Sequence, residues 1–294
     1  MLSWKRAVQR VQNSLDRTFF EERKKKAQIW NDTLSVLKKG SLKGKTFSFD
    51  QAVEECTSYH EIPQYPKSKT LAREFTEVEV IRSPLLDVAY DLLKAGYRPM
   101  AVHSSHPLRP AIKEKPTEEI FFRTNLSLVL NRKLGVQKKK IYPFSLYGGI
   151  YIPHVWILRE GKEKDYRFLD HPKEISIFSC SPIRSPHLEK RSDQKWWFAK
   201  SDEELMKMKI RMQLHVAYHQ KHDAIVIGPF GSEHANPLHH VAELYLQLIE
   251  KEFYGKIKRI TFAIRDEGER RFFNPLGNFK PFAETVDETG VVIS

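Results

Sequence analysis

Apolar residues recur along the first 40 positions at the spacing of one helix face, with basic residues between them. The apolar positions are Leu2, Trp4, Val8, Val11 and Leu15, followed by Trp30, Leu34 and Leu37. This spacing predicts a helix that ends at Gly40, because glycine suits the left-handed cap position. A helix lying on a membrane surface has the same pattern, but its continuation to Leu37 favours a helix packed on the body of the protein. Residues 41–75 are polar, contain Pro63 and Pro66, and are interpreted as an irregular connection.

From Thr76 onwards, short apolar runs alternate with segments of helical periodicity. The pattern predicts strands at 78–80, 100–102, 149–158, 175–180, 224–227 and 257–264, and helices at 84–95, 117–131, 202–220 and 237–253. Residues 181–200 are interpreted as a loop that contains Trp196 and Trp197. Alternating helices and short buried strands are typical of an α/β sheet that is covered on both faces.

Composition is that of a soluble globular protein, with 40% hydrophobic and 29% charged residues in 294. Two cysteines, Cys56 and Cys180, cannot form a disulfide scaffold, which favours a reducing compartment. No window approaches the roughly 18 apolar residues of a membrane span, and no hydrophobic signal core precedes the first helix. We therefore expect a cytoplasmic protein without a membrane span, and a monomer. Delivery to another cell without a conventional signal stays open.

Lys and Arg number 49 against 37 acidic residues, so the net charge is +12. An excess of this size favours anionic partners such as nucleotides, nucleic acid or acidic membranes. The densest basic runs, Arg23 to Lys26 and Lys138 to Lys140, are interpreted as exposed ends of elements. Because there is no recognised nucleic-acid module and no aromatic-basic repeat, nucleic acid is the less favoured partner.

The stretch from Ala224 to Pro237 has the pattern of a strand, a glycine-bearing loop and a helix start. Gly228 and Gly231 would let the backbone approach a ligand closely, and Asn236 would cap the helix with Pro237 at its first position. The free N–H groups of such a helix start bind anions. An ordinary turn between strand and helix has the same pattern, so the neighbouring loops matter. Ligands of such sheets bind at the carboxyl ends of strands, here after Val102, Cys180 and Ile227.

Thr117, Glu118 and Glu119 begin the predicted helix at 117–131. They suit a helix start without any function, since Thr117 is a good N-cap and acids favour the first turn. They also suit a site that cleaves a glycosidic bond. Adjacent helix positions point about 100° apart, so one acid would orient a sugar hydroxyl and the other would transfer the proton. Because a helix start favours the ionised carboxylate, proton donation would need desolvation or a nearby phosphate.

The histidines do not form a metal motif. His215 and His219 share a helix face, but no acid lies between them and neither cysteine has ligand spacing. We therefore expect no metal and no cofactor. Further histidines surround the predicted loops, where they would meet phosphate or lie on the surface: His103, His106, His234, His239 and His240. Trp196 and Trp197 would either stack on a base or cover the core beneath a loop.

Several segments, in this order, resemble the microbial-type poly(ADP-ribose) glycohydrolases, a branch of the macrodomain-like proteins. They are Arg23 to Gly40, Thr117-Glu118-Glu119 with Phe122 to Leu126, Ile150 to Arg159, Ile175 to Pro182, the helix around Arg211, Gly228 to Gly231 with Asn236-Pro237 and Val241-Ala242, and Phe262 to Ile264. The similarity covers residues 20–265. No single piece is specific, but the order and spacing of the pieces are.

The resemblance implies a three-layer α/β/α macrodomain-like mixed sheet with an N-terminal helical extension and an ADP-ribose pocket. The extension would span 1–75, the core 76–266 and a C-terminal tail 267–294. By resemblance, Glu119 matches the acid that protonates the departing group and Glu118 the acid that holds the ribose. Gly228, Phe230, Gly231 and Ser232 match the loop around the pyrophosphate. We also expect ligand contacts from residues in or beside the two loops: His103, Thr117, His234 and Asn236.

The chain also departs from the family pattern. The family has three glycines shortly before its catalytic acids, whereas residues 103–116 contain none, and Thr117 replaces a glutamine. Glu233, His234 and Ala235 stand where the family has glycine and an aromatic residue. Arg109 and Lys113 could supply charge instead, although long side chains are less directional than backbone N–H groups. The sequence therefore predicts a hydrolase that removes ADP-ribose from protein, with a non-catalytic ADP-ribose or nucleotide reader as the alternative.

Overall fold

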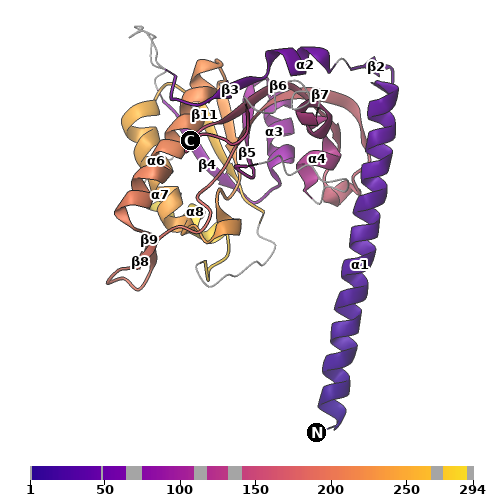
Figure 1. The fold of residues 1–294 in the computed structure, drawn as a ribbon, viewed down its shortest axis with the longest axis horizontal. Coiled ribbons are helices and arrows are strands. Elements are labelled where there is room, and N and C mark those ends of the chain that lie inside the picture. Colours follow the sequence, from indigo (N-terminus) through magenta and orange to yellow (C-terminus); the bar gives the residue numbers. More distant parts are fainter. Residues whose placement is uncertain are drawn as a thin grey trace.

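A seven-stranded mixed sheet forms the centre of the protein. The computed structural model describes residues 2–47, 49–63, 75–108, 118–131, 141–265 and 274–289. The strand order is β3-β6-β7-β5-β10-β11-β4, and Figure 1 shows the sheet between two sets of helices. The strands are β3 (Thr57–Tyr59), β4 (Glu77–Ile81), β5 (Pro99–Ser104), β6 (Gly149–Arg159), β7 (Phe168–Cys180), β10 (Ala224–Ile227) and β11 (Arg259–Ala263).

Strands β7, β5, β10, β11 and β4 run parallel, whereas β6 is antiparallel to both β7 and β3. The short apolar strand predicted at 224–227 pairs with Pro99–Val102 on one side and Arg259–Phe262 on the other. The carboxyl ends of the five parallel strands therefore lie at one edge of the sheet. In sheets of this kind that edge is where ligands bind.

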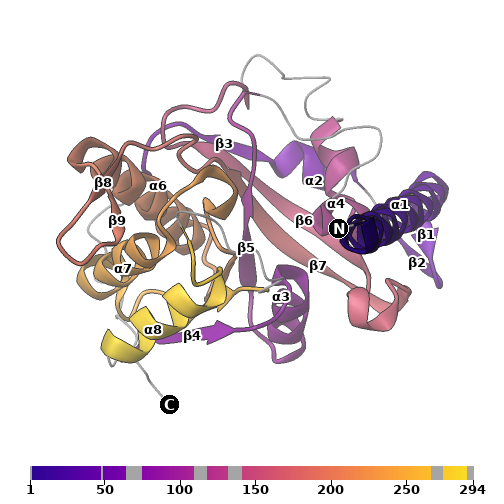
Figure 2. The same ribbon diagram turned by 90° about the horizontal axis from the view of Figure 1, so that it is seen from below.

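Helices cover both faces of the sheet, so the predicted three-layer α/β/α architecture is confirmed (Figure 2). One face carries α6 (Lys200–His219), α7 (Leu238–Leu248, extended by a π-helical turn at Ile249–Phe253) and α8 (Phe279–Thr289). The other carries α2 (Asp50–Glu55), α3 (Leu85–Lys94) and α4 (Glu119–Arg123). Side chains of β10 alternate between the two cores: Ile225 and Ile227 join the first, Ala224 and Val226 the second. This alternation explains the continuous apolar run in the sequence.

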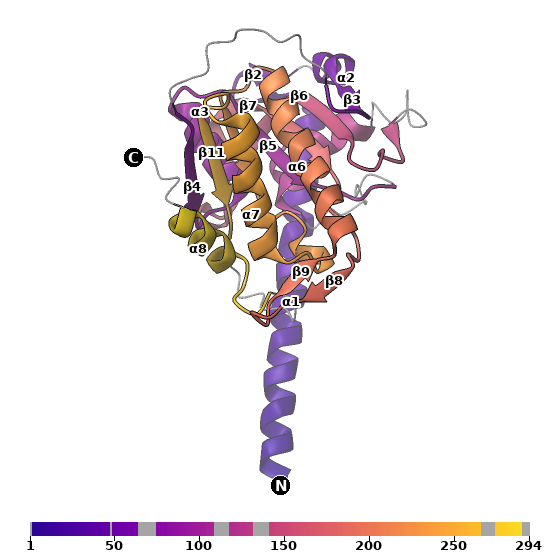
Figure 3. The ribbon, with the colours of Figure 1, turned by 90° about the vertical axis from the view of Figure 1, so that its left-hand side faces the viewer.

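The first helix, α1 (Leu2–Lys39), is a single 38-residue element. Its C-terminal half packs on the body through Ile29, Trp30 and Leu37, which are all buried. Its N-terminal half extends away from the body (Figures 1 and 3). Gly40 ends the helix with a left-handed φ of 70°, as predicted. None of the helices in the described ranges combines the length and the hydrophobicity that crossing a bilayer requires.

Two sequence predictions are wrong, one at residues 41–75 and one at 117–131. Residues 41–75 are not simply irregular, since they contain α2, β3 and a small hairpin of β1 (Ser41–Leu42) with β2 (Lys45–Thr46). The helix predicted at 117–131 is interrupted at Thr124, which is extended and forms a bridge with Ile157. The Thr124 hydroxyl accepts a hydrogen bond from Leu126 N at 3.1 Å, where helix resumes for 126–131. A threonine that caps the next helical turn in this way competes with continuation of the first.

Residues 181–200 and the C-terminal segment are also more ordered than predicted. The expected loop contains a hairpin of β8 (Leu188–Lys190) and β9 (Trp196–Phe198). Asp193 fixes its turn by accepting hydrogen bonds from Lys195 N at 2.9 Å and from the Trp197 indole. Helix α8 packs on the core rather than trailing from it, since Phe282 is fully buried against Phe262 with ring centroids 5.0 Å apart. The division of the chain at residues 75 and 266 stays a prediction.

Candidate functional site

A cavity of about 280 Å³ opens at the carboxyl edge of the parallel strands. Its wall includes Glu118 before α4, His103 at the end of β5, and the loop that follows β10. The acidic helix start and the glycine-bearing loop are far apart in sequence and nevertheless border one space. The remaining lining residues are Pro84, Leu85, Val102, Ser104, Ile120, Pro229, Glu233, Ala263 and Arg265 together with Gly228, Phe230 and Ser232. Its volume is close to that of a small ligand site.

The loop from Gly228 to Pro237 folds back on itself. Gly231 has a φ of 89°, and a side chain at this position would collide with Asn236. Four main-chain bonds close the loop: Phe230 N to Gly228 O at 2.7 Å, Ser232 N to Pro229 O at 3.0 Å, and His234 N and Asn236 N to Gly231 O at 2.9 and 3.3 Å. Gly228, Phe230 and Ser232 line the cavity, whereas Gly231, His234 and Asn236 are not among its described lining residues. Gly231 therefore serves the turn of the loop rather than the surface of the cavity.

The start of α7 differs from the prediction. Asn236 does not cap the helix, because its side-chain amide donates to Ile183 O at 2.8 Å and to Gly231 O at 3.0 Å within the loop. The helix begins at Leu238, with Pro237 before it. The Leu238 N–H donates instead to the Asn274 side chain at 3.0 Å. One backbone donor that an anion would use is therefore already occupied by a distant residue.

Glu118 lies directly on the cavity, and its side chain is 44% exposed. Its carboxylate accepts a hydrogen bond from His103 Nε2 at 3.1 Å, and His103 Nδ1 lies 2.9 Å from the Ser179 hydroxyl. A carboxylate can only accept, so His103 Nε2 is the donor of this hydrogen bond. His103 itself is buried, with its ring edge-on to Phe121. This chain of contacts fixes the Glu118 carboxylate while leaving one oxygen available to a ligand hydroxyl.

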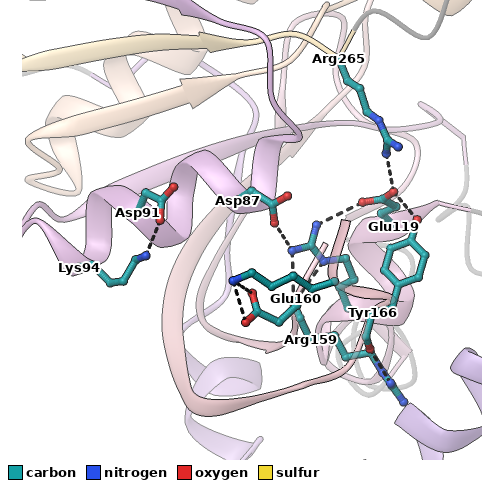
Figure 4. A network of polar contacts seen from close by, with 10 residues as sticks. Asp87, Asp91, Lys94, Glu119, Arg159, Glu160, Tyr166 and Arg265 are labelled. Atoms are coloured by element: carbon teal, nitrogen blue, oxygen red, sulfur yellow. Dashed lines mark hydrogen bonds and ion pairs between the residues drawn. The ribbon is translucent and has the colours of Figure 1, made fainter. Parts of the chain in front are cut away.

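Glu119 is held behind the cavity wall by three donors (Figure 4). Its Oε1 accepts from the Tyr166 hydroxyl at 2.7 Å and from Arg265 Nη1 at 2.8 Å. Its Oε2 accepts from Arg123 Nη1 at 3.2 Å. Burial raises the pKa of the Glu119 carboxyl, but the Tyr166 hydrogen bond and the charges of Arg123 and Arg265 outweigh burial and hold this pKa below its usual value. Glu119 is therefore ionised in this arrangement.

Arg123 is the centre of this network and is only 1% exposed. Besides Glu119 it binds the Asp87 carboxylate of α3, and its Nε and Nη2 both donate to Arg159 O at 3.2 Å. Gly161 lies against the other side of Asp87, where a methyl group would come closer to the carboxylate than van der Waals contact allows. The position of Glu119 thus depends on a turn that is 42 residues away in the chain.

Four residues of the site were not predicted from the sequence: Asp87, Arg123, Tyr166 and Arg265. Arg123 carried one usable signal, since it lies four positions after Glu119 and shares its helix face. Tyr166 and Arg265 follow no local pattern. Among the predicted residues, Thr117, Arg109 and Lys113 lie outside the described residues, as does most of the loop at 103–116.

The remaining candidates fall into other surroundings. His215 packs edge-on against Phe253 and His219 contacts the Tyr59 hydroxyl at 2.9 Å. No group of three metal-ligating side chains occurs in the described part of the chain. Trp196 lines a different cavity of about 270 Å³ together with His239, and Trp197 covers His239 and His240 while Arg191 stacks on it at 4.1 Å. Both interpretations of the tryptophans, base stacking and core cover, stay predictions.

No protein-family model matches the chain, and no curated protein does. Solved structures do match. The poly(ADP-ribose) glycohydrolase of Thermomonospora curvata superposes with a TM-score of 0.66 at 18% identity, over 88% of this chain and 98% of that one. Its complex with the inhibitor ADP-HPD gives 0.65 at 20% identity over the same shares. The Deinococcus radiodurans enzyme in complex with ADP-ribose gives 0.63 at 16% identity over 83% and 99%.

These similarities define the fold class. The chain has the macrodomain-like α/β/α fold of the microbial poly(ADP-ribose) glycohydrolases, as the resemblance in the sequence implied. It spans nearly the full length of the matched structures. Fold alone does not assign chemistry, which has to be argued from the site.

Proposed function

We propose that the protein is an ADP-ribosyl hydrolase that removes ADP-ribose from modified protein. The observation that carries the proposal is the shared cavity, because Glu118 and the loop after β10 border one space with Glu119 directly behind it. The structural neighbours are glycohydrolases solved with ADP-ribose or an inhibitor. In this assignment the distal ribose lies against Glu118, and the diphosphate lies along Gly228, Phe230 and Ser232.

The reaction is hydrolysis of the bond between ribosyl C1 and the protein side chain. Glu119 in its acid form donates a proton to the departing atom as that bond breaks, and water then adds to C1 and returns a proton to the Glu119 carboxylate. Glu118 accepts a hydrogen bond from a ribose hydroxyl, and His103 keeps the carboxylate in place. No metal or cofactor is needed for this step. Partner proteins are therefore those that carry ADP-ribose.

The test is release of ADP-ribose from a modified protein by Glu119→Gln, with Glu118→Gln as the matched neighbouring variant. Because a general acid contributes roughly 10²–10⁴ in rate, Glu119→Gln should lower turnover by that factor. Glu118→Gln should mainly weaken substrate binding, because a neutral amide accepts the ribose hydroxyl less strongly than a carboxylate does. The proton transfer by Glu119 should be largely kept. Comparable rates for Glu119→Gln and the unchanged protein would remove Glu119 from the reaction.

One observation supports a second function, a reader that binds ADP-ribose without turnover. Both oxygens of Glu119 are occupied and its pKa is lowered, so the carboxylate does not carry the proton that hydrolysis needs. Calorimetric titration with ADP-ribose beside a hydrolysis assay separates the two functions. Binding without product would support the reader, and absence of binding would count against both.

A further inference from the structure

Arg265 both lines the cavity and donates a hydrogen bond to Glu119. Among the described residues that line the cavity, it is the one that also binds the Glu119 carboxylate, through Nη1 at 2.8 Å. Tyr166 and Arg123, the other two donors to Glu119, do not line the cavity. A ligand can therefore reach one of the three donors that keep Glu119 ionised, and that donor is Arg265.

The charges along the described cavity wall make Arg265 the natural partner of an anionic ligand. Glu118 and Glu233 contribute two carboxylates, whereas Arg265 is the lining residue that carries a permanent positive charge. Part of the backbone anion site is already in use, since Leu238 N donates to Asn274. A diphosphate entering this cavity needs a cation, and a guanidinium binds phosphate oxygens in a two-pronged arrangement that one carboxylate oxygen does not match.

We propose that Arg265 is a positioning residue that responds to the diphosphate of the substrate: it binds Glu119 as the structure shows and turns to the diphosphate when a nucleotide enters. The inference rests on the proposed function, in that it takes the ligand to be ADP-ribose. It resolves the conflict between an ionised Glu119 and a proton-donating Glu119. The acid is formed only when the correct ligand is in place.

The proton balance follows from the groups that face Glu119. They are Arg123 of α4, Tyr166 before β7 and Arg265 after β11, with Asp87 of α3 facing Arg123 from the other side. When Arg265 leaves, the carboxylate loses one positive charge while its side chain, which is 23% exposed, stays mostly shielded from solvent, and Arg123 is shared with Asp87. The pKa of Glu119 therefore rises, and the carboxyl takes a proton from solvent. That proton is the one later transferred to the departing atom, so no other reactant is required.

The experiment measures proton uptake on binding, which does not depend on turnover. ADP-ribose is titrated calorimetrically between about pH 5 and pH 7 in buffers of different ionisation enthalpy, a range above the ordinary pKa of glutamate. The unchanged protein should take up a proton on binding. Glu119→Gln should bind without that uptake. Arg265→Gln should show little uptake and about tenfold weaker binding, because its Glu119 no longer faces the guanidinium and its diphosphate lacks a cation.

Arg265→Lys is the matched control, since it keeps the charge and should recover much of both effects. In a hydrolysis assay, Arg265→Gln should move the basic limb of kcat/KM to higher pH and leave that of kcat in place, because the two parameters report the free and the bound protein. A purely structural residue would not separate them. Binding by the unchanged protein without proton uptake, or uptake that persists in Glu119→Gln, would overturn the role of Arg265 while the proposed function stands. Absence of ADP-ribose binding would overturn both.

Discussion

Two arginines, Arg123 and Arg159, are buried next to each other and solve the same problem differently. They are 1% and 4% exposed, and Arg123 donates to the main-chain oxygen of Arg159. Arg123 is neutralised by two carboxylates, Asp87 and Glu119. Arg159 has no carboxylate within ion-pair distance among the described residues. Its donors meet the Thr33 hydroxyl at 2.7 Å, Tyr166 O at 2.8 Å and Ile29 O at 3.2 Å, while Phe168 stacks on the guanidinium at 3.6 Å.

The difference separates a residue that builds the site from one that attaches an element. Arg159 joins β6 to α1, because two of its three acceptors lie on that helix. Burial lowers the pKa of Arg159 to about 10, so the side chain is still charged at neutral pH. Arg123 joins α4 to α3 and holds the Glu119 carboxylate in position. A change at Arg123, which is paired with two carboxylates, should therefore disturb the site. A change at Arg159, which is held by a hydroxyl and two carbonyl oxygens, should instead disturb the attachment of α1.

The largest effect should come from Arg123→Met. It leaves Asp87 and Glu119 without their shared cation, and removing one partner of a buried ion pair costs about 3–5 kcal/mol. We expect a loss of that size in urea unfolding, together with loss of ADP-ribose release. Arg123→Lys keeps the charge but lacks the planar guanidinium, so its losses of stability and of ADP-ribose release should lie between those of Arg123→Met and the unchanged protein. A stability change below about 1 kcal/mol would show that the network is not structural.

Arg159→Met should have a smaller effect and a different one. Three acceptors lose a charged donor, and such bonds contribute about 1.5–3 kcal/mol each before the methionine side chain compensates by packing. We expect a net loss of about 2 kcal/mol in unfolding, with the rate of ADP-ribose release largely kept. Equal losses of activity in Arg159→Met and Arg123→Met would erase the distinction between the two arginines.

Thr33→Val tests the attachment of α1 alone. The Thr33 hydroxyl accepts from Arg159 and donates to Phe122 O at 2.8 Å, and valine removes it at almost constant volume. We expect about 1 kcal/mol of destabilisation by thermal unfolding. Thr33→Ser retains the hydroxyl and should lose less. A valine variant as stable as the unchanged protein would mean that the Arg159 anchor does not need this bond.

The smallest effect is on the pH dependence of stability. Because the folded protein holds the pKa of Glu119 below its unfolded value, Glu119 contributes stability that is fully present above about pH 4.3 and is lost as pH falls through the folded pKa. Unfolding at a series of acidic pH values should show a smaller decline for Glu119→Gln. An identical decline in both proteins would show that the carboxylate is not stabilised in the folded state.

Part of the fold could be predicted because the central strand β10 is apolar on both faces. Ile225, Val226 and Ile227 are all fully buried, so a continuous apolar run marked β10 without knowledge of its neighbours. Helices α3 and α6 were likewise predicted by amphipathic periodicity, nearly to their ends. The break at Thr124 was missed because the local cap of Leu126 N is accompanied by a bridge to Ile157, which no local pattern encodes.

The candidate site was predicted only where its residues lie in segments with a local sequence signature. Glu118 and Gly228 belong to segments with a local signature, and the structure brings both to one cavity. Arg265 and Tyr166 act on Glu119 across 146 and 47 positions of the chain. The Leu238 N–H at the start of α7 is bound by Asn274, 36 positions further along the chain, and not by the predicted cap Asn236. Contacts of this kind are decided by tertiary packing, so a single sequence does not reveal them.

The contact between Gly161 and Asp87 has a practical consequence for reading natural variation. Gly161 is buried, and the methyl group that alanine would add there would push on a carboxylate that is itself bound to Arg123. The disturbance would reach Glu119 in two further contacts without altering any residue that touches a ligand. In related chains, the residue at the position of Gly161 would therefore indicate whether the Glu119 carboxylate behind the cavity keeps the position seen here.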